Sequence, residues 1–357
     1  MNTLSFQHEA LPSRVVFGSG TLKKLPEETE RLNLRRALIV STPGQRASAE
    51  RVKALLGSAA AGVFANATMH TPAEVTQAAM AQSAELRADG FIAIGGGSAI
   101  GLSKALALRT DLPQIVIPTT YAGSEATAVL GETIDNVKHT QRSERILPET
   151  IVYDVDLTLG LPVSVSMASG VNAIAHAVEA LYATDRSPLT GLMAEAALNA
   201  LVDALPEIHS RPSNTDARAT ALWGAWLCGC CLGVTTMGLH HKLCHTLGGT
   251  YGLPHAPTHA VLLPHTLAYN LPFAPEARRT LFRVFVEADL AMALAQFIRR
   301  LELPCTLAQV GMPQSAIEAA AEMAVSKPYP NPRPLDREAI RGLLARAWSD
   351  GVPLAGQ

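Results

Sequence analysis

Net charge is almost absent from this sequence. Its 29 lysine and arginine residues nearly balance 31 aspartate and glutamate residues, for a formal net charge of −2, and charged residues make up only 17% of the chain. Nucleic acids and anionic membranes are bound mainly through clusters of positive charge. We therefore expect neither of them among the partners of this protein.

Long apolar runs are also absent, since none reaches the roughly 18–20 residues that a membrane-spanning helix needs. The first ten residues, MNTLSFQHEA, have neither the basic start nor the apolar core of a secretory signal peptide. Cysteine is rare: the chain has five, an odd number, and Cys228, Cys230 and Cys231 fall in an apolar helical run. These features predict a cytoplasmic protein whose cysteines are buried thiols.

At 357 residues, the chain is long enough to build two domains, each with its own core. In the first half, short apolar runs rich in β-branched residues alternate with helical patterns at 46–57 and 73–87. The predicted strands are 14–17, 37–40, 61–66, 90–94, 114–117 and 151–153. This alternation is typical of an α/β domain with a parallel sheet.

Long helical segments rich in alanine and leucine take over from about Met167. We expect them at 167–184, 190–206, 215–232, 238–247, 258–269, 275–302 with a break, 313–326 and 336–348. The sequence therefore predicts an α/β domain over residues 1–160 and an all-α domain over residues 161–357.

A glycine run joins a predicted strand to the next helix. Residues 91–104 read FIAIGGGSAIGLSK, in which Gly95, Gly96 and Gly97 are followed by Ser98, the expected helix cap. Glycines let backbone N–H groups approach a pyrophosphate closely, and a helix N-terminus supplies positive dipole and unpaired donors. The run therefore favours a cofactor-phosphate loop over glycines that only turn the chain.

A polar loop, PTTYAGSE at 118–125, follows the next strand, at the strand end where open α/β sheets bind ligands. Thr119 and Thr120 can bond a cofactor amide or sugar there, or can instead cap the following helix. From loop position we also assign Ser124 and Lys138 to the cofactor, and Tyr121 and Arg142 to the substrate.

Histidines gather in GLHHKLCHTLGGTYGLPH, residues 238–255, which hold four of the eleven in the chain. A helix over the first ten of these residues places His241 and His245 on one face, because residues four apart are neighbours. The two glycines that follow should end the helix, and a short loop should return His255 to the same place. His240 would then point elsewhere, as a bystander.

Asn172 and His176 also stand four apart, on a helix whose neighbouring positions are apolar. Two helices with N-x-x-x-H and H-x-x-x-H spacing can build a metal site or an acid/base site. A single histidine on an apolar face is more often a hydrogen-bonded core residue. Two such pairs and a loop histidine favour a functional site instead.

Together these motifs resemble the iron-containing alcohol dehydrogenase superfamily, which also includes proteins similar to dehydroquinate synthase. The resemblance rests on GGGS-x5-K, the P-T-T and G-S-E elements, H-x-x-x-H-x-L-G-G-x-Y-x-x-P-H and AVLLPH at 260–265. It implies an N-terminal dinucleotide-binding domain, a helical C-terminal domain and an active site in the cleft between them. It also implies NADH or NADPH as cofactor and, with an exposed Leu4–Phe6 segment able to extend a sheet, a homodimer.

Within that superfamily, Gly101, the sequence PTTYAGSEAT, Gln141-Arg142 and PHAPTH resemble the maleylacetate reductases. This implies reduction of the carbon–carbon double bond of maleylacetate, a small dicarboxylate, to 3-oxoadipate in aromatic-compound degradation, with substituted maleylacetates as further substrates. It assigns catalysis to His176, His241, His245 and His255. The alternatives are a metal-dependent NAD(P) alcohol dehydrogenase of the same superfamily and a non-catalytic nucleotide-binding sensor.

Two positions depart from the superfamily's pattern. The resemblance maps the metal ligands of the metal-dependent members, an aspartate and three histidines, onto Asn172, His176, His241 and His255. A neutral amide is a poor ligand for a divalent cation, so we expect no functional metal and a substrate contact at Asn172 instead. Thr42 stands where NAD-selective members place an aspartate, so both NADH and NADPH should be accepted.

Overall fold

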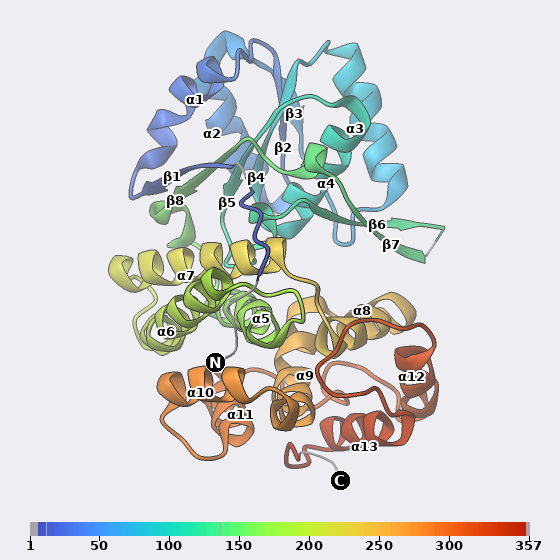
Figure 1. The fold of residues 1–357 in the computed structure, drawn as a ribbon. Helices are drawn as coiled ribbons and strands as arrows, with labels where there is room; N and C mark the ends of the chain where they lie inside the picture. Colours follow the sequence, from blue (N-terminus) through green and yellow to red (C-terminus); the bar gives the residue numbers. More distant parts are fainter. Residues whose placement is uncertain (1–5, 12, 136, 355–357) are drawn as a thin grey trace. The chain divides into compact units, whose positions relative to one another are not determined.

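The structure of the chain, a computed structural model (Figure 1), describes residues 6–11, 13–135 and 137–354. The chain divides into two compact units. Ala10–Leu161 forms one, and the described residues 6–9 join residues 162–354 in the other. This differs from a first domain that begins at residue 1. The reason is that the N-terminal residues contact the second unit, where His8 Nδ1 lies 3.0 Å from Ser187 Oγ.

The first unit, here called the sheet unit, contains a six-stranded sheet in the order β1-β8-β5-β4-β2-β3, with every neighbouring pair parallel. Its strands are β1 (Arg14–Gly18), β2 (Ala37–Val40), β3 (Ala60–Phe64), β4 (Gly90–Gly95), β5 (Gln114–Pro118) and β8 (Thr150–Asp154). Every residue of β2, β4, β5 and β8 is buried, as expected for a parallel sheet covered on both faces. The predicted α/β architecture is confirmed.

Four helices accompany this sheet: α1 (Leu25–Arg31), α2 (Arg46–Leu56), α3 (Ala73–Glu85) and α4 (Gly97–Thr110). The first two lie on one side of the sheet, and the last two lie on the other (Figure 1). The seven short 3₁₀ helices of the described chain are η1 (Thr21–Lys24), η2 (Pro43–Gln45), η3 (Gly57–Ala59), η4 (Ser124–Ala126), η5 (Glu144–Ile146), η6 (Val155–Thr158) and η7 (Leu271–Phe273).

An antiparallel hairpin of β6 (Val129–Ile134) and β7 (Val137–Arg142) is separate from the main sheet. The sequence does not predict it, because its residues are largely polar; outside the pair, Thr133 of β6 forms an isolated bridge with Pro72. Lys104 of α4 ties the hairpin to the helix, since its buried Nζ donates to the carbonyl oxygens of Thr127 and Val129 at 2.7 and 3.1 Å. Burial lowers the pKa of Lys104 to about 7. The loop after β5 is thereby held against α4.

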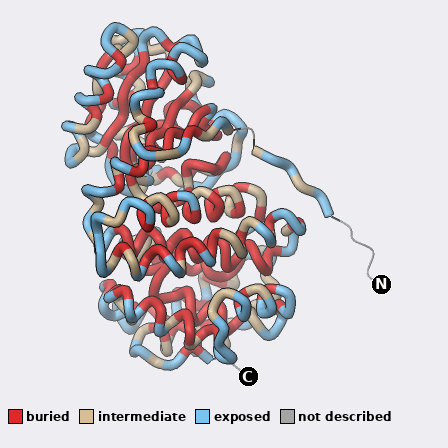
Figure 2. Tube along the Cα trace, turned by 90° about the vertical axis from the view of Figure 1, so that its left-hand side faces the viewer, coloured by how far each residue is buried: buried red, intermediate tan, exposed pale blue. Residues whose placement is uncertain are grey.

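The second unit, here called the helical unit, contains nine α-helices among its described residues. They are α5 (Val163–Tyr182), α6 (Pro188–Ser210), α7 (Thr215–Val234), α8 (Leu239–Tyr251), α9 (His255–Asn270), α10 (Pro275–Phe285), α11 (Leu290–Arg300), α12 (Ala316–Val325) and α13 (Arg337–Trp348). At its centre is α5, which contacts α6, α7, α9 and α10, and every residue from Ser166 to Tyr182 is buried (Figure 2). A helix that is apolar all round is expected in a core. The predicted all-helical second half is confirmed.

By length and composition alone, α7 could cross a membrane. The expectation that the chain has no apolar run of this length missed it. In the structure, 56% of that stretch is buried inside the helical unit, where α7 packs against α5 and α6. Its fully buried Arg218 donates from Nη1 to Ser166 Oγ at 2.8 Å. Cys228 and Cys231 are buried free thiols as predicted, whereas Cys230 is half-buried. These contacts are those of a core helix.

Candidate active site

The glycine run forms the turn between β4, which ends at Gly95, and α4, which begins at Gly97. Gly95 has a φ of +147°, which residues with side chains rarely adopt, and a Cβ there would lie 2.4 Å from Gln45 Oε1. Gly96 is the N-cap residue, and no side chain caps the helix. The prediction that Ser98 caps α4 is therefore wrong, because the glycines themselves make the turn and Ser98 already lies in the first helical turn.

Gly96 and Gly97 have different surroundings. A Cβ added at Gly96 would lie 2.9 Å from Thr120 Cγ2, whereas a Cβ at Gly97 would meet no atom within 4 Å. Gly97 is exposed at the start of α4, where the first N–H groups of a helix have no intrahelical partner. This open, uncapped terminus fits an anionic group such as the pyrophosphate of a dinucleotide.

Other predicted cofactor residues lie at the same edge of the sheet, because the carboxyl ends of parallel strands meet there. Thr42 follows β2, and Thr119 and Thr120 follow β5. The buried Thr119 donates its N–H to the Gly95 carbonyl at 3.0 Å, and its hydroxyl accepts from Gln45 Nε2 at 2.8 Å. Thr119 thus fixes the loop against the glycine run, while the half-buried Thr42 and Thr120 are free to meet a ligand.

The residues assigned from loop position lie in different settings. Tyr121 is fully buried in the loop after β5. Ser124 begins η4, and its carbonyl accepts from Lys104 Nζ, which ties it to the helix that the glycine run opens. Arg142 is exposed at the end of β7. The side chain of Lys138, also in β7, lies outside the described residues.

In the helical unit, the four predicted histidines come together from three helices: His176 from α5, His241 and His245 from α8, and His255 from α9. Ring centroids are 5.1 Å apart for His176 and His241, 6.0 Å for His241 and His245, and 6.2 Å for His245 and His255. Asn172 lies one turn before His176 on α5 and is buried. The structure therefore groups these rings, here called the histidine cluster, as their spacing predicts.

The helix that carries two of these histidines is longer than predicted. Gly248 and Gly249 lie inside α8, which ends after Tyr251, where Gly252 adopts a φ of +67° as the C-cap. The first two glycines looked like the stop, but only the third has the left-handed backbone that ends a helix. His255 is accordingly the first residue of α9 and not part of a loop.

Sequence reasoning missed His259, one turn after His255 on α9. Its ring centroid is 4.4 Å from that of His255 and 4.9 Å from that of His241. The i,i+4 spacing in HAPTH was the available signal. His240 is fully buried, and its Nε2 lies 2.9 Å from His259 Nδ1. The prediction of a bystander at His240 is therefore wrong, because this ring faces α9, which the pattern of α8 alone does not reveal.

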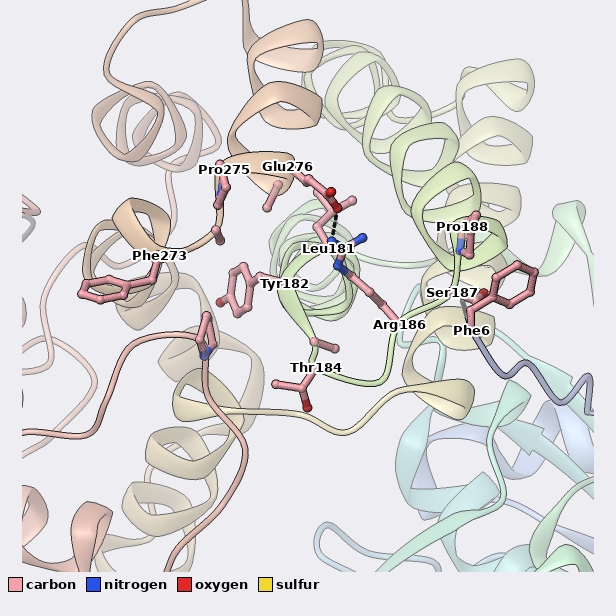
Figure 3. Close-up of a pocket in the computed structure, with 14 residues that line it drawn as sticks. Phe6, Leu181, Tyr182, Thr184, Arg186, Ser187, Pro188, Phe273, Pro275 and Glu276 are labelled. Carbon is pink, nitrogen blue, oxygen red and sulfur yellow. Dashed lines mark hydrogen bonds and ion pairs between the residues drawn. The ribbon is translucent and has the colours of Figure 1, made fainter. Parts of the chain in front are cut away.

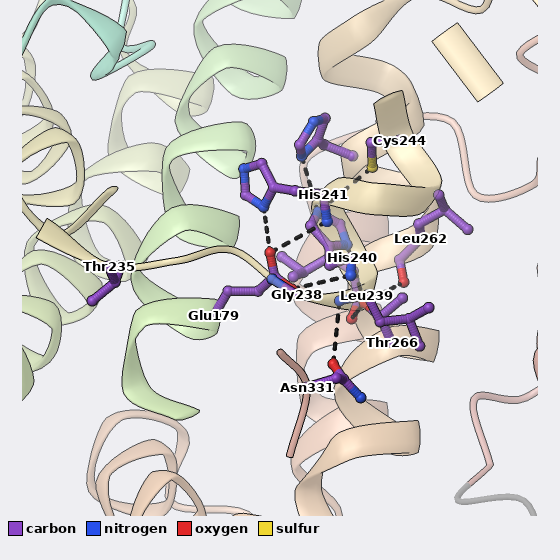
Figure 4. A network of polar contacts seen from close by, with 12 residues as sticks. Glu179, Thr235, Gly238, Leu239, His240, His241, Cys244, Leu262, Thr266 and Asn331 are labelled. Carbon is purple, nitrogen blue, oxygen red and sulfur yellow. Dashed lines mark hydrogen bonds and ion pairs between the residues drawn. The ribbon is translucent and has the colours of Figure 1, made fainter. Parts of the chain in front are cut away.

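Glu179, the one charged residue of α5, was also missed. Its buried carboxylate accepts from the backbone N–H groups of Gly238 at 3.1 Å and His240 at 3.0 Å, and it bonds His241 Nδ1 (Figure 4). An acid at a helix N-terminus also complements the helix dipole. Glu179 therefore sets both where α8 begins and how the ring of His241 is held. A lone acid on an apolar helix was its signal.

Burial favours the neutral form of three rings in and beside the cluster. His176, His240 and His259 all have a pKa well below the ordinary histidine value, first because burial removes hydration and then because neighbouring imidazoles would repel a further charge. In the described contacts, His241 is the ring that bonds the Glu179 carboxylate. A carboxylate in contact with an imidazole compensates a positive charge on that ring, and the Glu179–His241 pair provides this contact.

Four buried polar atoms of this region have no hydrogen-bond partner: Asn172 Oδ1, His176 Nδ1, His241 Nε2 and His259 Nε2. Such atoms are uncommon, and a group of them points to a ligand that satisfies them. Imidazoles are common ligands of Zn²⁺ and Fe²⁺, but Asn172 offers a neutral amide, which is a poorer ligand than a carboxylate. The carboxylate of Glu179 already accepts from three backbone N–H groups and bonds His241 Nδ1. The described donor set therefore lacks the anionic ligand that a divalent cation favours.

A second group of candidate metal ligands is His240, Cys244 and His259, whose ligand atoms all lie within 4.8 Å of one another. All three residues are buried. However, His240 and His259 already hydrogen-bond to each other, and Cys244 Sγ lies 3.8 Å from His240 Nε2. These donors are paired among themselves, which does not favour an ion.

A surface pocket of about 600 Å³ in the helical unit is separate from the histidine cluster. Tyr182, Arg186, Phe273 and Glu276 are among its lining residues, and Phe6 lies beside its Ser187–Pro188 wall (Figure 3). Phe6 belongs to the segment predicted to extend a sheet; Leu4, at the start of that segment, lies outside the described residues. Arg186 pairs with Glu276 in this pocket, so its charge is already neutralised.

Comparison with known proteins places both units in one family. A family model described as iron-containing alcohol dehydrogenase matches residues 12–155. A second model, described as the C-terminal part of the Fe-containing alcohol dehydrogenase family, matches residues 166–348. Together the two models span the sheet unit with its glycine run and the helical unit with its histidine cluster.

Similar proteins match over nearly the whole chain. The maleylacetate reductase of Burkholderia cepacia is 52% identical over 98% of this chain and 99% of its own length. The crystal structure of the maleylacetate reductase from Agrobacterium tumefaciens matches with a TM-score of 0.95 at 50% identity, covering 98% of this chain and 100% of that one. An iron-containing alcohol dehydrogenase from Corynebacterium glutamicum matches with a TM-score of 0.92 at 39% identity, covering 97% and 98%. This chain therefore belongs to the iron-containing alcohol dehydrogenase family.

Proposed function

We propose that this chain is a maleylacetate reductase, an oxidoreductase that uses NADH or NADPH to reduce the carbon–carbon double bond of maleylacetate to 3-oxoadipate. The observation that carries the proposal is the 52% identity, over 98% of this chain, to the maleylacetate reductase of Burkholderia cepacia. The histidine cluster also supports it, because Asn172 stands where the metal-dependent members have an aspartate ligand.

The substrate is a conjugated enone, so its reduction needs a hydride at the β-carbon and a proton to complete the product. A bound nicotinamide supplies the hydride. As the double bond's electron pair moves toward the carbonyl, negative charge develops on that oxygen, and a preorganised donor there lowers the barrier. The chain has to supply this donor and the proton.

His241 is the group we assign to this task. Its Nδ1 is bonded to the Glu179 carboxylate, which stabilises a positive imidazole, and its buried Nε2 has no protein partner. His245 shares polarisation and proton donation, while His176 and His255 hold a substrate carboxylate or share that role. Asn172 then offers an amide, without charge, to a dianionic substrate.

This assignment needs no metal, because the neutral donors around Asn172 lack the carboxylate that a divalent cation favours. The alternative is a metal-dependent alcohol dehydrogenase of the same family. The test is to follow the NADH absorbance band on adding maleylacetate, before and after dialysis against EDTA. We expect equal rates in both. No turnover of maleylacetate, together with alcohol oxidation that requires Fe²⁺ or Zn²⁺, would establish the alternative.

For the cofactor, we infer that the glycine run holds the pyrophosphate and that both NADH and NADPH are accepted, since no carboxylate at Thr42 repels a 2′-phosphate. Gly97→Ala should weaken NADH binding at least roughly tenfold without loss of stability, because its methyl group projects into the open phosphate site and alanine is a better helix former. Fluorescence titration and thermal unfolding measure the two effects. Gly96→Val is a poorer test, since the added Cβ meets Thr120.

The matched control is Gly191→Ala in α6, another helical glycine where an added Cβ meets nothing within 4 Å. It should leave NADH affinity unchanged. If Gly97→Ala bound NADH as tightly as this control, the pyrophosphate would have to lie elsewhere.

We further infer a cytoplasmic homodimer that binds neither nucleic acid nor membrane. The small net charge supports the last two points. Exposed apolar side chains of the helical unit, among them Leu189, Leu192 and Phe282, offer area for a second copy. A monomer mass measured by light scattering at micromolar concentration would contradict the inference of a homodimer.

A further inference from the structure

His259 Nε2, one of the four unpartnered buried atoms, stands at the end of a chain of hydrogen bonds. The chain starts at Thr266 on α9, whose hydroxyl oxygen lies 3.0 Å from the Leu262 carbonyl oxygen and 3.0 Å from His240 Nδ1. His240 Nε2 then lies 2.9 Å from His259 Nδ1. Thr266, His240 and His259 are all fully buried, so bulk water does not interrupt the chain.

The chemistry of these groups limits where the protons are. A carbonyl oxygen only accepts, so the Thr266 hydroxyl donates to Leu262, and its oxygen accepts from His240 Nδ1. His240 Nε2 then accepts from His259 Nδ1, since two ring nitrogens that share one hydrogen bond hold one proton between them. A neutral His259 is left with an unprotonated Nε2.

The opposite proton order would have the Thr266 hydroxyl donate to His240 and would put the last proton on His259 Nε2. That order leaves a buried N–H donor without a partner, which is rarer in proteins than an under-satisfied acceptor. Cys244 also favours the first order, in which His240 Nε2 is an acceptor. Its thiol is a weak donor, and its Sγ lies 3.8 Å from that nitrogen. Burial also lowers the pKa of His240 and of His259, which keeps each ring at one proton.

We propose that His259 is a positioning residue of the histidine cluster, with its proton held on Nδ1 by the Thr266–His240 pair and its unprotonated Nε2 available to accept a hydrogen bond. The rings of His255, His241 and His176 surround it, with centroids 4.4, 4.9 and 6.5 Å away.

Of these neighbours, His241 is the ring that depends on this proton position. Glu179 holds one proton of His241 on Nδ1, so a positively charged His241 carries its second proton on Nε2, which has no protein partner. An unprotonated His259 Nε2 brings a lone pair, and not a second N–H, to the ring packed edge to face against His241, which stabilises the charged form and leaves the His241 N–H to the substrate. This role rests on the proposed function, in which His241 is the proton donor.

The first arm of the test reads the proton positions directly, by NMR of the full-length protein labelled with ¹⁵N-histidine, with the His259 signals assigned from their loss in His259→Gln. We expect a protonated Nδ1 and an unprotonated Nε2. Thr266→Val removes the hydroxyl that accepts from His240, so the proton of His259 should move to Nε2. Thr266→Ser keeps the hydroxyl and should keep the parent pattern.

The second arm measures kcat with maleylacetate and NADH. Thr266→Val should lower kcat roughly 10- to 100-fold, a part of what general acid catalysis supplies, with an unchanged Kd for NADH, and Thr266→Ser should recover it. The control is Thr258→Val on the same helix, which removes a buried hydroxyl that donates to the Pro254 carbonyl at 2.8 Å. It should leave both the NMR pattern and kcat unchanged.

A parent protein that carries the His259 proton on Nε2 would overturn the proposal, and so would a Thr266→Val enzyme with the parent's kcat. Failure of the proposed function looks different, since the parent itself would then not reduce maleylacetate. In that case the NMR arm alone decides whether the Thr266–His240 pair holds the proton of His259.

Discussion

Replacing Glu179 with glutamine should lower kcat for maleylacetate reduction by roughly 10²–10⁴-fold, the contribution typical of general acid catalysis, because a neutral amide no longer stabilises a positively charged His241. An ionised carboxylate only accepts, so Glu179 keeps a proton of His241 on Nδ1. A glutamine can keep its oxygen on the N–H groups of Gly238 and His240 and turn its amide toward His241. That amide donates, so Nδ1 has to accept, and His241 is held neutral with its one proton on Nε2, as a far weaker acid than the imidazolium.

The same substitution removes the negative charge that stabilises a positive His241. The two effects act together on proton delivery, and neither involves the sheet unit's glycine run. We therefore expect kcat to fall while the Kd for NADH, measured by fluorescence titration, and the cooperative thermal unfolding of the protein are retained. Glu179→Asp keeps the charge on a shorter side chain and should retain more of the parent's kcat than Glu179→Gln.

Glu28→Gln is the matched control, because Glu28 is an equally buried acid in the sheet unit, paired with Arg14 and Arg31. It should lower stability and leave kcat unchanged. A Glu179→Gln enzyme that kept the parent's kcat would show that His241 does not depend on this carboxylate.

The sheet and the second domain's helices could be predicted because their patterns are local. β2 and β4 are continuous apolar runs bounded by polar or glycine residues, and α5 carries apolar residues on every side. The β6–β7 hairpin could not, since a largely polar pair of strands carries no strong periodicity. The end of α8 was misplaced because Gly248, Gly249 and Gly252 look alike in sequence and differ only in backbone conformation.

In the candidate site too, some residues could be predicted from the sequence and others could not. His241 and His245, four residues apart on one helix, follow from spacing, and so do Asn172 and His176. Contacts between helices do not follow from it. Glu179 reaches the start of α8 from α5, and His240 reaches across to α9, so neither role is visible in a single helical pattern.

Replacing Asn172 with aspartate should lower kcat/KM for maleylacetate by several-fold to several hundred-fold. Asn172 is buried, its Oδ1 has no partner, and it lies one turn from His176. The aspartate has the same shape but places a negative charge beside a dianionic substrate. Like charges at close range in a partly dry site cost about 1–4 kcal/mol, which corresponds to that range of rates. Asn172→Leu, of similar size and uncharged, should escape the charge penalty.

The assay buffer has to be treated with chelator, because the same aspartate also restores the anionic donor that a divalent cation favours. Titration calorimetry should therefore detect tighter binding of Fe²⁺ or Zn²⁺ to Asn172→Asp than to the parent. A parent enzyme that lost activity on chelation and regained it with Fe²⁺ would show that the neutral donors do hold a functional metal. Without metal, an Asn172→Asp enzyme with the parent's kcat and KM would show that the substrate's charges lie away from Asn172. The two substitutions thus separate the charge of the pocket from the proton chemistry of His241, since aspartate at Asn172 should act mainly on KM and glutamine at Glu179 on kcat.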